Sequence, residues 1–403
     1  MSNVDYLVSI VIATHNRSKY AISCIESLLS IASSEIQVVV HDTSNDACEL
    51  AAWAGQSADS RLIYVHWADR LSMTENHERA LKLATGEYIC LIGDDDTVSS
   101  YIIDIANYAK KQNIKMLTPK VKAAYYWPDF RTKNYGAAHA GRIYLSQFDC
   151  SLTKYDVEER LEEALSIACQ GTDGMPKLYH GLVLRSLLDD IRALNGTLLY
   201  GTSPDMSAAV SLCLTGGEYY LIDFPFTMPG GGGGSNSGRS ATGKHKGGLD
   251  KDPHLTPFKN LNWSTFIPRF FSVETVWGHA AWDTLEHRKS VTGYNLSRLY
   301  ALCFFHHPDY ARETYQAWRS AKQSGLPNVG TWAVCREIVS VGGKYVLAKF
   351  KRVLNPGPSN GSEVIAVVEN VALAREKLDE SLGKKLAGSD LNTRLTDLPV
   401  LRK

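Results

Sequence analysis

The hydrophobic and polar positions of the first hundred residues follow two alternating patterns. Residues 7–13, 36–40, 62–65 and 88–92 are short apolar runs rich in β-branched side chains, which is typical of buried strands. Between these runs, apolar residues recur at helical spacing, as they do over residues 22–29. Strands that alternate with helices predict an α/β fold with a parallel, doubly wound sheet.

The pattern changes after residue 116. We expect a strand near residues 143–145 and helices over residues 157–168 and 182–194, an order that fits an antiparallel extension of the sheet. A glycine-rich segment follows at residues 229–258, and its composition predicts either a mobile loop or a loop that a ligand orders.

These changes divide the chain into four parts. Residues 1–228 form the α/β domain, residues 229–258 the glycine-rich loop, and residues 259–355 a helical region packed on that domain. Residues 356–403 are expected to form a C-terminal helical tail, with a last helix from about residue 363 to 386.

Composition excludes several classes of protein. The 403 residues contain 43 Lys and Arg against 43 Asp and Glu, so the positive field that nucleic-acid binding requires is absent. The eight cysteines include no Cys-x-x-Cys pair and are predicted to be reduced. We find neither the pattern of a signal peptide nor an apolar run of transmembrane length. The sequence therefore predicts a cytoplasmic protein and leaves contact with the inner face of a membrane open.

Three consecutive carboxylates, Asp94, Asp95 and Asp96, follow the apolar run at residues 88–92. Adjacent negative charges repel one another in a partly dry site unless a cation or hydrogen-bond donors neutralise them. A hard divalent ion, Mg²⁺ or Mn²⁺, prefers oxygen ligands and also accepts diphosphate oxygens. Judged alone, the triplet fits a solvated loop or a helix cap as well.

The segments at residues 8–17, 38–46, 84–89 and 93–96, together with Asn76, resemble family 2 glycosyltransferases with the GT-A fold in order and spacing. The resemblance implies a Rossmann-like, mostly parallel sheet flanked by helices, with a mainly helical C-terminal region. It also implies transfer of a sugar, with inversion, from a nucleotide-sugar donor to a glycan or lipid-linked acceptor in cell-surface polysaccharide synthesis. A UDP-sugar is the expected donor.

The same resemblance implies roles for individual residues. Thr14, Asn16 and Asp42 would cradle the nucleotide base, although His41 stands where the family usually has another acid. For Asp42, a role in capping a turn or helix is equally open.

Five further residues are implied in binding the donor or the metal. Arg70 and Asn76 lie where similar enzymes line the nucleotide and sugar pocket, and Arg70 alone reads equally as a surface cation. Asp94 would face the ribose, and Asp95 and Asp96 would hold the metal. Because three acids are adjacent, the family's Asp-x-Asp motif can be shifted by one position along them.

The glycine-rich segment continues into a cationic stretch that contains Arg239, Lys244 and His245. A flexible basic loop would close over a diphosphate and exclude water, and His245 would add a metal ligand. The alternative is a linker whose charges only aid solubility.

Asp205 stands at the start of an apolar helix, about a hundred residues after the acidic triplet. In inverting enzymes of similar sequence, an acid at this place is the general base. The alternative is an aspartate that only stabilises the first turn of its helix.

Residues 345–354 place apolar side chains on one helical face and basic residues elsewhere. Such a helix either rests on an anionic membrane or turns its apolar side towards the protein core. The sequence indicates no oligomeric state.

Two rival functions remain. One is a non-catalytic nucleotide-sugar-binding scaffold in a polysaccharide assembly complex, against which the complete triplet and Asp205 argue. The other is a dinucleotide-dependent oxidoreductase, which would need a glycine-rich turn after the first strand, where this chain has Thr14-His15-Asn16-Arg17.

Overall fold

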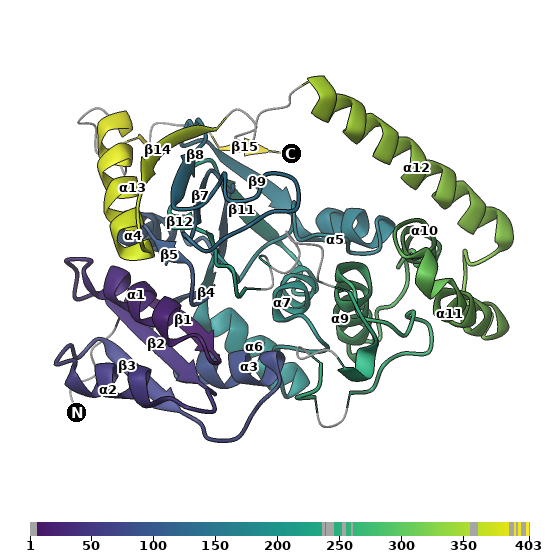
Figure 1. Ribbon diagram of the computed structural model, residues 1–403, viewed down its shortest axis with the longest axis horizontal. Helices are drawn as coiled ribbons and strands as arrows, with labels where there is room; N and C mark the ends of the chain where they lie inside the picture. The colour runs from purple at the N-terminus through teal and green to yellow at the C-terminus, as the bar shows by residue number, and fades with distance from the viewer. Residues whose placement is uncertain are drawn as a thin grey trace.

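The computed structural model describes residues 6–235, 238, 246–251, 255–258, 261–354, 362–386, 391, 394–395 and 400–402. A central sheet carries helices on both faces, and a further group of helices lies at one side (Figure 1). The predicted fold class is confirmed.

The main sheet has nine strands in the order β15-β9-β11-β6-β10-β4-β1-β2-β3. Its parallel core is β4-β1-β2-β3, in which Val8 pairs with Ile36 on one side and with Tyr88 on the other. The strands are β1 (Val8–Thr14), β2 (Ile36–Asp42), β3 (Leu62–His66), β4 (Tyr88–Ile92), β6 (Met116–Pro119), β9 (Leu152–Asp156), β10 (Leu182–Leu184), β11 (Glu218–Ile222) and β15 (Leu401–Arg402).

Two hydrophobic cores cover the two faces of this sheet. Along β1, the side chains of Ile10 and Ile12 enter one core and that of Val11 enters the other, because successive residues of a strand point to opposite faces. The first core is closed by α1 (Ser18–Leu29), α4 (Ile102–Lys111) and α13 (Val371–Leu386). The second is closed by α3 (Met73–Lys82), α5 (Val157–Ser166), α6 (Arg185–Asn195), α7 (Pro204–Cys213) and α9 (Val273–His287). Because both faces of the sheet are buried, the sequences of these strands are continuous apolar runs.

The antiparallel extension is also present. Strand β10 runs antiparallel to both β4 and β6, and β9 runs antiparallel to β11. The helix predicted over residues 182–194 is wrong in its first turn, because residues 182–184 form β10 and the helix begins at Arg185. Leu182 and Val183 are buried between β4 and β6. Pairing with these strands stabilises the extended conformation more than the local helical periodicity favours a helix.

The C-terminal segment departs from the prediction. The last helix was expected from about residue 363, but Glu363–Val367 is strand β14 and α13 begins at Val371. Strand β14 pairs antiparallel with β8 at the edge of a four-stranded sheet, so the tail is not purely helical. The smaller sheets consist of β7 (Ala123–Tyr126), β8 (Arg142–Leu145), β13 (Gly230–Gly231) and β14, and of β5 (Thr97–Val98) with β12 (Thr227–Met228).

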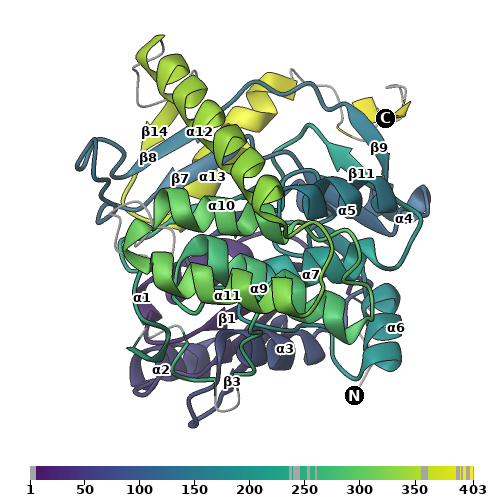
Figure 2. The same cartoon turned by 90° about the vertical axis from the view of Figure 1, so that its right-hand side faces the viewer.

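The region after the glycine-rich segment is mainly helical, as predicted. Helices α9, α10 and α11 pack together at one side of the molecule, and α12 packs against α10 and runs diagonally away from this group (Figure 2). The remaining elements are α2 (Cys48–Gln56), α10 (Leu296–His306), α11 (Ala311–Gln323), α12 (Thr331–Leu354) and the 3₁₀ turns η1 (Leu249–Lys251) and η2 (Pro308–Tyr310). None of the helices in the described ranges combines the length and the apolar character needed to cross a bilayer. The domain boundaries at residues 228, 258 and 355 stay a prediction.

Candidate functional site

Three strands of the parallel core end at one cavity. Strand β1 ends at Thr14 and β2 at Asp42, which are paired in the register, and β4 ends at Ile92, with Gly93 between it and the acidic triplet. The cavity has a volume of about 570 Å³. Its lining includes Thr14, Arg17, Arg70, Asn76, Asp94, Asp95, Asp96, Tyr179, His180, Gly230 and Ser235. Ligands of open α/β sheets bind beyond the carboxyl ends of the strands, so this cavity is the candidate site.

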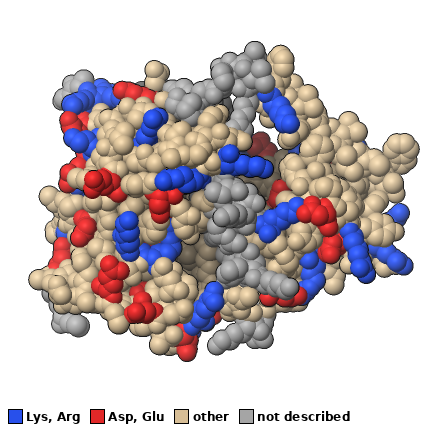
Figure 3. Space-filling model, in the orientation of Figure 1, with Lys and Arg blue, Asp and Glu red and all other residues tan. Residues whose placement is uncertain are grey.

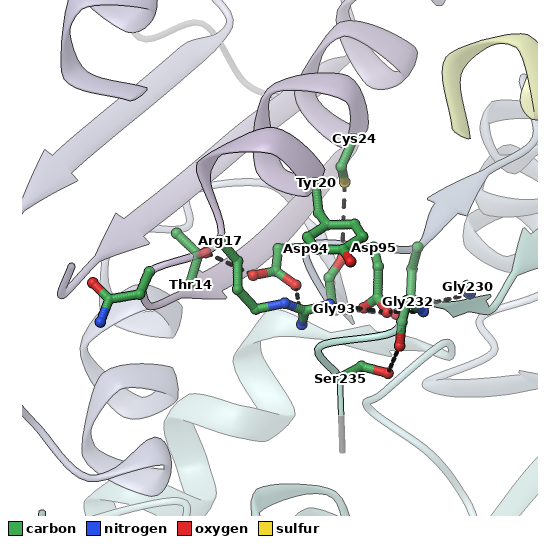
Figure 4. A network of polar contacts seen from close by, with 12 residues as sticks. Thr14, Arg17, Tyr20, Cys24, Gly93, Asp94, Asp95, Gly230, Gly232 and Ser235 are labelled. Atoms are coloured by element: carbon green, nitrogen blue, oxygen red, sulfur yellow. Dashed lines mark hydrogen bonds and ion pairs between the residues drawn. The ribbon is translucent and has the colours of Figure 1, made fainter. Parts of the chain in front are cut away.

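Arg17 is the cation that faces the acidic triplet (Figure 4). Its Nη1 lies 2.5 Å from Oδ1 of Asp94, and its Nη2 lies 3.1 Å from Oδ2 of Asp95. The Thr14 hydroxyl donates to the other oxygen of Asp94 at 2.6 Å. The guanidinium also lies over the ring of Tyr20, with Cζ 4.7 Å from the ring centroid. A single arginine therefore offsets part of the charge of three buried carboxylates.

The glycine-rich segment supplies further donors to the triplet. The backbone N–H of Gly230 donates to Oδ1 of Asp96 at 2.6 Å, and that of Gly232 donates to Oδ2 of Asp95 at 2.9 Å (Figure 4). A Cβ atom on Gly230 would lie 1.8 Å from the carbonyl oxygen of Asp95. Only glycine permits this close approach, so the start of the segment is fitted to the acidic triplet.

The carboxylates of the triplet differ in their surroundings. Burial, together with the charges of Asp96 and Asp94, raises the pKa of Asp95 to about 7 against the charge of Arg17. Burial would also raise the pKa of Asp96, but the charge and hydrogen bond of His180 and the N–H groups of Gly230 and Gly93 hold it below its usual value. Asp94 and Asp95 thus hold a negative charge at a cost in free energy, and a positive ligand would lower this cost.

Comparison with known families matches residues 9–158 to the model described as glycosyl transferase family 2. Residues 9–158 form a glycosyl transferase family 2 domain. This range contains Thr14, Arg17 and the three aspartates, so the family predicted from the sequence motifs is confirmed.

A curated glycosyltransferase also matches part of the chain. Glycosyltransferase GlyG of Streptococcus pneumoniae is 27% identical over 99 residues, which cover 24% of this chain and 33% of that protein. The chain thus matches about a third of the length of this curated relative.

Among solved structures, S. aureus TarS residues 1–349 with UDP-GlcNAc has a TM-score of 0.43 and 15% identity, and covers 79% of this chain and 92% of that chain. The complex of the same TarS fragment with UDP has a TM-score of 0.40 and 17% identity, and covers 55% and 60% of the two chains. Similarity at this level is too low to indicate a shared substrate.

Four of the residues predicted to bind the donor line the cavity. They are Thr14, Arg70, Asn76 and Asp94. The Asn76 amide donates to the carbonyl oxygen of Thr14 at 3.1 Å, and its Oδ1 lies 2.7 Å from Nδ1 of His41. Asn76 thereby ties the ends of β1 and β2 together and shapes the cavity through them.

Asn16 and Asp42, also predicted to cradle the base, are placed differently. The Asp42 carboxylate is buried, where it accepts hydrogen bonds from the N–H and hydroxyl of Ser44 at 2.8 and 2.5 Å and from Tyr64 at 3.0 Å. Asn16 is exposed with φ +56° and accepts from the N–H of Asn45 at 2.9 Å. Neither side chain lines the cavity, so both organise the loops after β1 and β2, and base recognition by them stays a prediction.

Asp205 lies in the first turn of α7, as predicted, with Pro204 at the helix start. Its half-buried carboxylate accepts a hydrogen bond from the Ser203 hydroxyl. Burial raises the pKa of Tyr179 well above its usual value, and the charges of the triplet and of Asp205 add to this rise. Tyr179 lines the cavity, whereas Asp205 does not.

The predicted metal ligands are only partly described. His245 lies outside the described residues, as do Arg239 and Lys244 of the predicted lid. Within the described part of the chain, no group of three or more metal-ligating side chains has converged on one point. Asp95 and Asp96 nevertheless fit a hard divalent cation, since they are adjacent, buried oxygen donors that line the cavity.

Sequence reasoning missed three residues of this site. Arg17 stands within the first strand-end motif but was given no role, and Tyr179 and His180 follow a segment without recognisable periodicity. The Nε2 atom of His180 lies 3.2 Å from Oδ2 of Asp96, and the Tyr179 hydroxyl donates to the same oxygen at 3.2 Å. His180 has φ +65°, a left-handed backbone that is uncommon outside glycine and that sequence periodicity does not reveal.

Proposed function

We propose that this chain is a glycosyltransferase that moves a sugar from a nucleotide-sugar donor to a hydroxyl group of a glycan or lipid-linked acceptor in polysaccharide synthesis. The observation that carries the proposal is the cavity of about 570 Å³ at the strand ends, where Arg17 and three buried aspartates of the family 2 domain face one another. A UDP-sugar is the proposed donor.

The proposed reaction is a single displacement with inversion at the anomeric carbon. The acceptor oxygen forms a bond to that carbon while the bond from carbon to the diphosphate oxygen breaks, and the hydroxyl proton passes to Asp205. The Ser203 hydroxyl orients the Asp205 carboxylate through its hydrogen bond. Arg17 offers positive charge on the side where the leaving diphosphate gains negative charge.

A divalent cation fits this scheme through the chain's own residues. Asp95 and Asp96 would hold it, and when bound it supplies positive charge to the diphosphate. Their carboxylates now accept N–H groups of Gly232 and Gly230, so we propose that the start of the glycine-rich segment moves when the cation and the donor bind.

The test is a donor-hydrolysis screen with UDP-, GDP-, CMP- and dTDP-sugars in the presence of Mn²⁺ or Mg²⁺, since hydrolysis requires no knowledge of the acceptor. We expect one nucleotide class to bind and to be hydrolysed slowly. Asp95→Asn should abolish this signal, whereas Asp173→Asn, an exposed carboxylate outside the cavity, should not. Tight binding without hydrolysis or transfer across a panel of glycan acceptors would favour the non-catalytic scaffold, and absence of binding to every donor would refute both.

A further inference from the structure

Helix α12 has two apolar faces, and only one of them is packed. Val334 and Val341 are 2% and 3% exposed and lie against α10, where Val341 contacts Ala301 and Leu302. The ion pair between Arg298 and Glu337, at 3.3 Å, fixes the same side of the helix. This face gives α12 its orientation on the helical region.

The opposite face carries a line of exposed apolar residues that we call the outer stripe, namely Trp332, Val339, Val346 and Phe350. Their exposed fractions are 88%, 75%, 65% and 63%. Steps of seven, seven and four residues keep all four on one side of a helix with 3.6 residues per turn. Leu347, 62% exposed, widens the stripe near the end of the helix. Isolated exposed apolar residues are normal, but a continuous line along one helix marks an interaction surface.

The charged residues in the second half of α12 have one sign. Between Glu337 and Glu363 the sequence contains four basic residues, Lys344, Lys349, Lys351 and Arg352, and no acidic residue. Lys344 and Lys349 are exposed in the structure. In Figure 1, α12 extends along the outer edge of the molecule, and Figure 3 shows this edge as mostly apolar or neutral with cationic side chains towards the end of the helix.

We propose that the outer stripe of α12 docks on an anionic lipid surface. An apolar face that begins with a tryptophan and is accompanied by lysine and arginine has the chemistry of a helix that lies in the membrane interface. The apolar side chains enter the acyl boundary while the basic residues meet anionic headgroups. A second copy of the chain is disfavoured as the occupant, because two such helices side by side would place like charges together. The inference is independent of the proposed reaction.

The experiment is flotation of the full chain with vesicles of phosphatidylcholine, with and without phosphatidylglycerol. We expect the protein to float only with the anionic vesicles and to be released by high salt. The double variant Val346→Glu/Phe350→Glu should lose at least about tenfold in bound fraction, because it places charge on the apolar face. The matched control is Leu194→Glu, since Leu194 is 72% exposed on α6, away from α12.

A second measurement reports on the stripe directly. Cys335 is exposed three residues after Trp332, and Cys48 is the other exposed cysteine of the described residues. In a Cys48→Ser background, a polarity-sensitive dye on Cys335 should shift to the blue with anionic vesicles. The proposal is overturned if the wild type does not float, if neutral vesicles bind equally well, or if the double variant floats normally. It is also overturned if light scattering shows a dimer that the double variant dissociates, which would assign the stripe to self-association. Thermal melting and nucleotide titration of each variant confirm that it is folded.

Discussion

The guanidinium of Arg17 lies 2.5 Å from the carboxylate of Asp94, joining the turn after β1 to the turn after β4. Replacing Arg17 with glutamine leaves the buried triplet without its arginine. We expect the free energy of unfolding near neutral pH to fall by on the order of 1–3 kcal/mol, with a smaller difference in acid, where the carboxylates are protonated. Nucleotide affinity should fall about tenfold or more, as measured by calorimetry.

The control for this variant is Arg269→Gln. Arg269 forms an exposed pair with Asp250 at 3.1 Å, and such pairs contribute little to stability. If Arg17→Gln were as stable as this control at neutral pH and bound nucleotide normally, Arg17 would have no part in the site.

The second prediction concerns the cation. Asp95→Asn and Asp96→Asn should each weaken Mn²⁺-dependent UDP binding by about tenfold or more while the fold persists, because each removes a charged oxygen ligand. Titration with UDP in the presence and absence of Mn²⁺ measures this effect. Unchanged affinity in both single variants would rule out the metal assignment.

The third prediction separates two roles of Asp205. If Asp205 is the general base, Asp205→Asn should retain donor binding and lose about 10²- to 10⁴-fold in transfer rate. If it only stabilises the start of α7, the variant should instead lose about 1 kcal/mol of stability at a normal rate. Transfer rate and melting temperature are measured together, with Glu158→Gln in the first turn of α5 as the control for a helix-start acid.

The fourth prediction uses the backbone donors of the glycine-rich segment. Because the Gly230 N–H donates to the Asp96 carboxylate at 2.6 Å, hydrogen exchange at this amide should be slow in the free protein. Asp96→Asn weakens the acceptor and should accelerate exchange by about tenfold or more. Donor with Mn²⁺ should change exchange across residues 230–247, and identical exchange with and without a saturating donor analogue would contradict the predicted lid.

The fifth prediction is a pH dependence far from the cavity. Burial would raise the pKa of Glu274, but hydrogen bonds with His306 and His307 at 2.9 and 2.8 Å hold it well below its usual value. A carboxyl with a lowered folded pKa contributes stability above its unfolded pKa, and this stability is lost as the pH falls through the folded value. Glu274→Gln should therefore lose on the order of 2 kcal/mol near pH 7, and progressively less as the pH falls below the ordinary Glu pKa of about 4.3. Urea unfolding measures the difference, and Glu286→Gln, exposed on the same helix, should show little change over this pH range.

The sequence was most informative where local pattern and burial agree. The run over residues 88–92 is β4 itself, and Asp205 lies in the first turn of a helix as predicted. It was misleading at residues 182–184 and 363–367, where the apolar periodicity is ambiguous. Residues 182–184 form a strand because they pair with β4 and β6, and residues 363–367 form a strand because they pair with β8. A pairing partner distant in sequence leaves no local signal.

The sequence by itself determined the α/β class, the family and the position of the acidic triplet, because strand and helix periodicity and a run of carboxylates are local properties of the chain. Only the tertiary structure decided which groups meet those carboxylates. Arg17, His180 and the N–H groups of Gly230 and Gly232 reach the triplet from separate segments. It also decided that the Asp42 carboxylate accepts hydrogen bonds from Ser44 and Tyr64, and that the second apolar face of α12 is exposed. The physical reason is that hydrogen bonds and burial depend on distances in space, which the folded sheet and the packed helices set.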